Sequence, residues 1–201
     1  MWLLGLGLAA QARDATDAAD TAAQAEAQLA EQIRLRAELD RLAARNAWAG
    51  VSRVFAELEA AGPPVPLDVV LLGAQAALAE GDVLLAVQRL QDATTGEPRD
   101  GDAWGRAREQ LADLEHRYGA VRITVYTPKV PELDRPEMPL APDERTVIEE
   151  VRRRVLKERR FLGMLPVGRY VLGEVPFEVQ SRAPIADVRV GVPPQSGSSA
   201  D

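Results

Sequence analysis

The chain has 201 residues, with 24 basic against 31 acidic side chains and a net charge of −7. Its hydrophobic fraction of 46% is rich in alanine and includes only 4% aromatic residues, which favours closely approaching helices over a thick core. The acidic balance argues against general nucleic-acid binding, because counterion release needs a basic surface. The absence of cysteine excludes disulfides, thiolate metal ligands and cysteine nucleophiles.

The chain opens with the apolar run MWLLGLGLAA, residues 1–10. A membrane-spanning helix needs about twenty such residues, so we expect no transmembrane span. The run fits a secretory h-region, and Ala10-Gln11-Ala12 supplies the small-x-small pattern that a signal peptidase reads, although no basic residue precedes the run. We therefore expect residues 1–12 to be a signal peptide, and the protein to lie in the periplasm or cell envelope of a bacterium. The alternative is a hydrophobic helix turn docked on a cytoplasmic protein.

Two helices are predicted next. No Gly or Pro interrupts residues 14–46, where one apolar stripe recurs at three- and four-residue spacing through Leu29, Ile33, Leu35, Leu39 and Leu42. A second helix ends at Gly62 before two prolines, and it carries on one face Trp48, Val51, Phe55 and Leu58.

Residues 67–118 carry a spaced set of small and turn-forming residues. Gly81 is expected at a helix–helix turn and Asp82 as the cap of the next helix; Ala86 and Ala93 lie where that helix approaches its partner closely, and Pro98 stops it. Trp104 falls where a following unit would carry its tryptophan. This pattern resembles a tetratricopeptide repeat, although Val70 stands at the tryptophan position of the first unit and Ala77 at its usual tyrosine. The resemblance implies a helical domain over 13–118, five stacked helices closed by residues 102–117, and a groove for a peptide or partner helix.

The residue pattern changes from helical to strand-like at Gly119. Val121, Ile123 and Val125 alternate with polar residues as in a half-buried strand, and five prolines then predict an extended connection. Residues 143–160 predict a helix with Asp143 as a plausible cap. Residues 161–179 follow, and their phrase LPVGRYVLG resembles the closing hairpin of PEGA-like and carboxypeptidase-regulatory-like modules. Those families mostly serve for attachment and spacing, so the resemblance implies a non-catalytic role.

These elements predict an α+β protein. A stack of helical hairpins would precede a small antiparallel β-sandwich-like module over 119–192, with one inserted helix near 143–160. The composition of residues 193–201, PPQSGSSAD, predicts a disordered tail.

The strongest charge feature is RRRVLKERR, residues 152–160. It holds six basic residues against the single acid Glu158, and these are Arg152, Arg153, Arg154, Lys157, Arg159 and Arg160. Such a run is typical of a solvated helix face that pairs with Glu149 and Glu150 one turn earlier. The alternative is a face that binds an acidic partner, an anionic envelope polymer or nucleic acid.

No phosphate loop, metal-ligand spacing or nucleophile elbow occurs in the sequence, so we expect no cofactor, no metal and no enzymatic activity. The single histidine, His116, is expected at a helix end, where it would stabilise that end rather than act as a base. We therefore expect a scaffold or adaptor of the bacterial cell envelope that binds a protein partner. The competing hypothesis is a cytoplasmic regulator that binds nucleic acid or an acidic partner through residues 152–160.

Overall fold

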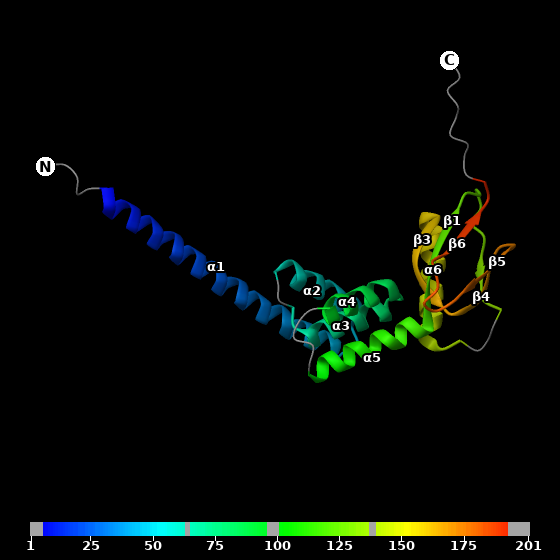
Figure 1. Ribbon diagram of the computed structural model, residues 1–201, viewed down its shortest axis with the longest axis horizontal. Helices are drawn as coiled ribbons and strands as arrows, with labels where there is room; N and C mark the ends of the chain where they lie inside the picture. Colours follow the sequence, from blue (N-terminus) through cyan, green and yellow to red (C-terminus); the bar gives the residue numbers. More distant parts are fainter. Residues whose placement is uncertain (1–5, 63–64, 96–100, 137–139, 193–201) are drawn as a thin grey trace, which may run out of the picture. The chain divides into compact units, whose positions relative to one another are not determined.

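The computed structural model describes residues 6–62, 65–95, 101–136 and 140–192, with side chains from residue 22 onward. Residues 1–5 of the predicted signal peptide, Pro98 and the predicted tail lie outside the described residues. Over these described residues the chain is α+β: five helices precede two three-stranded sheets, and a sixth helix is inserted between strands (Figure 1). It divides into two compact units, Met1–Val65 and Pro66–Asp201.

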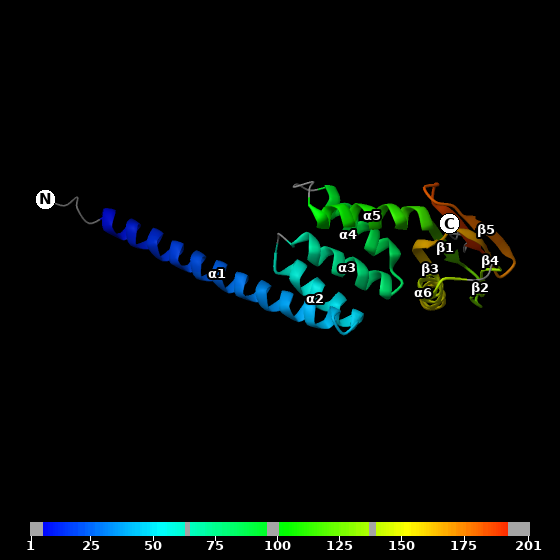
Figure 2. The same ribbon diagram turned by 90° about the horizontal axis from the view of Figure 1, so that it is seen from below.

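The first unit is a pair of helices of unequal length, α1 (Leu6–Ala43) and α2 (Trp48–Ala60). Asn46 takes a left-handed conformation, with φ of 53°, in the short turn between them. The two helices approach closely at Gly50, where a Cβ atom would lie 3.1 Å from the side chain of Leu42. At the other end of α2, the Gln32 side chain donates a hydrogen bond of 3.1 Å to the carbonyl of Gly62. Figures 1 and 2 both show α1 continuing well beyond α2.

The prediction of one apolar stripe along α1 was wrong. Leu35 and Leu39 are buried, but Leu29 is 58% exposed and Ile33 is 63% exposed. The reason is the helical period, because two residues at about 100° each place Ile33 nearly opposite Leu35. The spacing of these leucines therefore describes two faces of α1, of which only one is buried.

The second unit begins with three helices, α3 (Leu67–Ala79), α4 (Val83–Thr95) and α5 (Asp102–Arg117), in which α4 packs against both α3 and α5. The predicted turn and cap are confirmed: Gly81 has φ of +80°, and the Asp82 carboxylate accepts a hydrogen bond of 3.1 Å from the backbone N–H of Leu85. Ala86 is fully buried, as close helix packing requires, and Ala93 is half-buried.

Two small sheets follow the helices. Sheet A contains β3 (Arg160–Pro166), β1 (Tyr118–Val125) and β6 (Ala186–Val190) in that order, and sheet B contains β2 (Leu133–Asp134), β4 (Gly168–Leu172) and β5 (Val175–Val179). The pairs are antiparallel except for β1 and β6, which run parallel. The inserted helix, α6 (Pro142–Glu158), lies between β2 and β3 in the chain.

The hairpin predicted from LPVGRYVLG is confirmed. Gly168 begins β4 after a tight turn, and Gly173, with φ of 64°, turns the chain into β5. Between them Tyr170 is buried, and its hydroxyl donates a hydrogen bond of 2.7 Å to the carbonyl of Pro166. The buried phenol therefore ties β4 to the end of β3.

The helices and the sheets of the second unit share one hydrophobic core. Residues of α3–α5, such as Leu90 and Leu114, belong to the same buried cluster as Val151 of α6 and Ile123 of β1. The predicted change at residue 119 is thus a change from helix to strand inside one compact unit, since α5 ends at Arg117 and β1 begins at Tyr118.

We predict that Gly81→Ala destabilises the protein by about 2 kcal/mol, because φ is positive and the new Cβ would lie 2.9 Å from the Cβ of Glu150 on α6. The matched control is Gly105→Ala in α5, where a Cβ would have open space and should stabilise the helix by about 0.5 to 1 kcal/mol. Urea unfolding measures both changes, and equal effects at the two positions would contradict the close approach at Gly81.

Candidate interaction surfaces

The first half of the basic run, Arg152–Arg154, is held by the protein's own acceptors. The Arg152 Nε donates 2.7 Å to the carbonyl of Leu133 on β2, and the Arg153 guanidinium binds both carboxylate oxygens of Glu150 at 2.8 and 2.6 Å. Within this half of the run, Arg153 thus pairs with a glutamate one turn earlier, and these contacts leave less charge for a partner.

Arg154 joins α6 to the α3–α4 turn. Its guanidinium donates 2.6 Å to Glu150 on the same helix and 2.7 Å to Asp82, the residue that caps α4. Burial opposes ionisation of Glu150, but the hydrogen bonds from Arg153 and Arg154 outweigh it, so the pKa of Glu150 lies below its usual value. The Asp82 carboxylate thus caps a helix with one oxygen and binds an arginine with the other.

The second half of the run changes structure within three residues. Arg159 ends α6 in a left-handed conformation, with φ of 57°, and donates to the carbonyls of Thr127 and Pro128 at 3.2 and 2.9 Å. Arg160 is the first residue of β3, and Lys157 is exposed on α6. The six basic residues therefore do not form one helix face, because the last of them belongs to a strand.

Arg160 instead joins residues of two other strands on the outer side of sheet A. In the register of the sheet, Thr124 of β1 stands beside Arg160 of β3 and Arg189 of β6, while Arg122 stands beside Leu162 of β3 and Asp187 of β6. Side chains two residues apart on a strand share a face. We call this face the arginine face, and it consists of Arg122, Thr124, Arg160, Leu162, Asp187 and Arg189. Sequence reasoning missed it because its members come from three separate segments.

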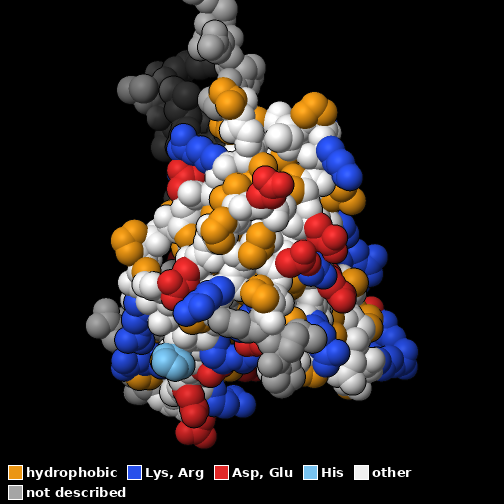
Figure 3. Space-filling view, turned by 90° about the vertical axis from the view of Figure 1, so that its right-hand side faces the viewer, with side chains coloured by type: hydrophobic (Ala, Val, Ile, Leu, Met, Phe, Trp, Pro, Cys, Tyr) orange, Lys and Arg blue, Asp and Glu red, His pale blue; other side chains and the backbone are white. Residues whose placement is uncertain are grey.

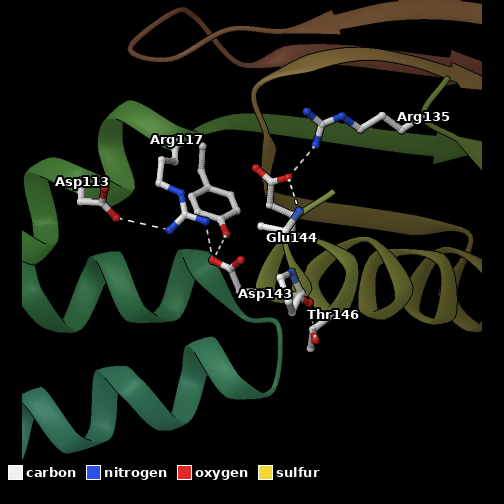
Figure 4. Close-up of polar contacts among 9 residues, drawn as sticks. Asp113, Arg117, Arg135, Asp143, Glu144 and Thr146 are labelled. Carbon is white, nitrogen blue, oxygen red and sulfur yellow. Dashed lines mark hydrogen bonds and ion pairs between the residues drawn. The ribbon is translucent and has the colours of Figure 1, made fainter. Parts of the chain in front are cut away.

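A second polar cluster lies where α5, β1 and the start of α6 meet (Figure 4). Figure 4 shows Arg117 between Asp113 and Asp143, and the structure gives it an ion pair with each. The buried hydroxyl of Tyr118 donates 3.4 Å to the same Asp143, and burial raises the pKa of Tyr118 to about 12. The expectation that Asp143 caps α6 was wrong, because α6 begins one residue earlier and Asp143 binds Arg117 instead.

At the N-terminus of α6 it is Glu144, and not Asp143, whose side chain binds the backbone of the N-cap residue. The Glu144 carboxylate accepts a hydrogen bond of 3.3 Å from the backbone N–H of Ala141 and lies 3.4 Å from the guanidinium of Arg135. That guanidinium also donates 3.0 Å to the carbonyl of Val167 and lies over the ring of Tyr170 at 5.7 Å. Both clusters link elements of the unit through internal ion pairs, although the buried Nε of Arg135 has no hydrogen-bond partner among the described residues.

The two remaining sequence candidates lie on or near α5. Trp104 is half-buried, its ring is covered by the Arg108 guanidinium at 4.9 Å, and it lines an open hollow of about 440 Å³ together with Thr94 and Leu111. His116 is exposed in the last turn of α5, and it is the pale blue side chain in Figure 3. Figure 3 also shows Lys and Arg side chains gathered toward the edges of that view, with hydrophobic side chains between them.

Within the described ranges, no three His, Asp or Glu side chains are grouped in a way that could hold a metal ion. Over those ranges, too, every helix is too short or too polar to cross a bilayer. No family model matches the chain, and no curated protein or solved structure is significantly similar to it. The residues themselves therefore carry the functional argument.

We predict that Glu150→Gln destabilises the protein by about 1 to 2 kcal/mol at neutral pH, because two arginines lose their carboxylate. Since the folded pKa of Glu150 is lowered, its contribution is complete above the unfolded pKa near 4.5 and disappears as the pH falls through the lower folded value. The difference in unfolding free energy between Glu150→Gln and wild type should therefore become smaller at acid pH. Chemical unfolding across pH measures it, with the exposed neighbour Glu149→Gln as the control; a pH-independent difference would refute the assignment.

Proposed function

We propose that the protein is a non-catalytic scaffold or adaptor of the bacterial cell envelope that acts through protein–protein contacts. The observation that carries this proposal is the uncovered part of α1. The helix spans Leu6–Ala43, of which residues 13–43 remain after the proposed cleavage, and α2 has only 13 residues, so at about 1.5 Å per residue α2 accompanies less than half of its length. The last residues of this pair, Ala61 and Gly62, accept hydrogen bonds from Gln28 and Gln32, which marks how far along α1 the pairing reaches.

Leu29 and Ile33 give α1 an exposed apolar pair for a partner helix at the edge of the uncovered part, beside Gln28 and Gln32, where the pairing with α2 ends. They are four residues apart on one side of α1, and each exposes more than half of its surface. A helix outside a packed core is only marginally stable in water, and it is stabilised when an apolar stripe is covered by another element. Recognition of this kind uses anchors at three- and four-residue spacing, which this pair supplies.

The second unit supports an adaptor role because its helices and its β elements are fixed to one another. Gly81 of the α3–α4 turn lies against α6, and Arg154 of α6 binds Asp82 of the same turn. The likeness of residues 67–118 to tetratricopeptide repeats and of residues 161–179 to PEGA-like modules points the same way. The former family binds peptides and helices, and the latter acts in attachment and spacing.

Export to the envelope is supported by the apolar run of residues 1–10 and by Ala10-Gln11-Ala12. The competing hypothesis, a cytoplasmic regulator with residues 152–160 as its binding face, has less support. Arg152, Arg153 and Arg154 are engaged with Leu133, Glu150 and Asp82, as the distances above establish.

We predict that the mature protein, purified from its native cells, begins at Arg13, because cleavage after Ala12 follows the small-x-small pattern. Intact mass spectrometry gives the answer directly. A chain that still carries Met1 or Trp2 would contradict export by this signal and favour the docked-helix alternative.

We predict that a photo-crosslinking amino acid placed at Gln24 or Glu26 on α1 captures a protein partner in native cells, and that Leu29→Lys/Ile33→Lys abolishes the adduct by putting charge in an apolar contact. The matched control, Ala23→Lys/Ala27→Lys, adds the same charge to exposed positions of the same helix and should retain the adduct. Lysine is a good helix former, so neither variant unfolds α1. Loss of the adduct in both variants, or its persistence in both, would refute the role of the apolar pair.

A further inference from the structure

The arginine face holds guanidinium groups that the fold does not use. Within the described part of the chain, Arg122 and Arg160 make no hydrogen bond or ion pair, in contrast to Arg152–Arg154. Arg189 pairs with Asp187 at 2.7 Å, and Arg189 and then Arg122 hold the pKa of Asp187 below its usual value. The face therefore has three positive charges against one negative charge on a chain whose net charge is −7.

Neighbouring strands and α6 shape this face into a shallow hollow. Arg122 and Thr124 of β1, Arg160 and Leu162 of β3, and Arg154 and Glu158 at the end of α6 line an open space of about 600 Å³. Leu162, which stands directly beside Arg122, exposes 54% of its surface. The hollow thus offers two unpaired guanidinium groups and an apolar contact between them.

We propose that the arginine face binds an acidic segment of a protein partner, with carboxylates on Arg122 and Arg160 and an apolar side chain against Leu162. Charge complementarity determines the sign of the occupant, because arginine binds carboxylates in a planar, bidentate geometry. The inference rests on the proposed function, since it specifies the chemistry of one partner of the adaptor.

The pattern of charge favours a peptide over a uniform polyanion. Asp187 stands beside Arg122 in the sheet and Glu158 lines the hollow, so a nucleic acid or an anionic membrane would bring its phosphates against carboxylates as well as arginines. A peptide can place its few carboxylates on the two free arginines and its apolar side chain on Leu162.

Fluorescence anisotropy tests the proposal with the full chain and a labelled peptide that repeats Glu-Glu-Leu, beside a Gln-Gln-Leu peptide as the uncharged probe. We expect wild type to bind only the acidic peptide, and more weakly as the ionic strength rises from about 0.05 to 0.15 M. Arg122→Gln/Arg160→Gln should weaken binding about tenfold, because two exposed ion pairs are lost. Arg106→Gln/Arg145→Gln removes the same charge from exposed positions on α5 and α6 and should change binding less than about twofold.

Leu162→Ala separates the apolar contact from the charge and should weaken binding by a factor of about three to ten, with the salt dependence unchanged. Equal losses in the two double-arginine variants, or no binding by wild type, would overturn the proposal. So would binding of phosphatidylserine vesicles or single-stranded DNA that depends on Arg122 and Arg160 as strongly as peptide binding does. Sedimentation that reveals a dimer dissociated by Arg122→Gln/Arg160→Gln would overturn it in favour of a second copy as occupant.

The variants change exposed side chains, so thermal unfolding should match wild type and confirm that lost binding is not lost folding. This experiment is independent of the crosslinks at α1. If the peptide fails and the α1 adduct persists, the arginine face is refuted and the adaptor function stands. If the α1 adduct fails and the peptide binds, the contact at Leu29 and Ile33 is refuted and the arginine face stands.

Discussion

The bond between Arg154 and Asp82 connects the helical part of the second unit to its β part. Asp82 is already committed to capping α4, so the arginine can bind it only if the α3–α4 turn lies against α6. Gly81 makes this approach possible, because any side chain there would meet the backbone of Thr146 and the Cβ of Glu150. Two adjacent residues, Gly81 and Asp82, thus form the turn, cap α4 and provide the surface on which α6 packs. Helices α3–α5 and the sheets also share one hydrophobic core.

This junction shows that some of the residues that resemble a repeat motif serve a contact other than the packing of one repeat on the next. In a helical array, a glycine at the turn permits close packing of the next hairpin. In this chain the element packed on that turn is α6, a helix inserted between two strands. Ala86, which is fully buried, still serves close helix–helix packing. The sequence pattern therefore identifies where the chain requires small residues, and the structure identifies which neighbour requires them.

The fold class, the boundaries of α5 and the LPVGRYVLG hairpin could be predicted because each depends on residues close in sequence, whereas α1 begins at Leu6, within the predicted signal peptide, and not at residue 14. The periodicity of α6 and the glycines around β4 are local signals of this kind. The position of Asp143 could not be predicted, because its partner Arg117 is supplied by another element. The error at Leu29 and Ile33 has a different origin: three- and four-residue spacing alone does not show on which side of a helix a stripe lies. The parallel pairing of β1 with β6 is equally non-local, since β2, α6, β3, β4 and β5 lie between the two strands in the described part of the chain.

The basic run shows most clearly how a run of charge in sequence differs from a charged surface. Residues 152–160 are contiguous, yet the left-handed Arg159 divides them between a helix and a strand. In the helical half, Arg153 is paired with Glu150 one turn earlier, and Arg154 is paired with Asp82 of the α3–α4 turn. On the strand side, Arg160 acquires neighbours from β1 and β6, and these neighbours are what make a surface. Because a strand sends alternate residues to opposite faces, the single arginines Arg122 and Arg189 contribute to this surface while their neighbours Ile123 and Val188 build the core. A cationic surface on an acidic protein thus arises from isolated arginines brought into register by a sheet, and the longest cationic run in the sequence contributes only one residue to it.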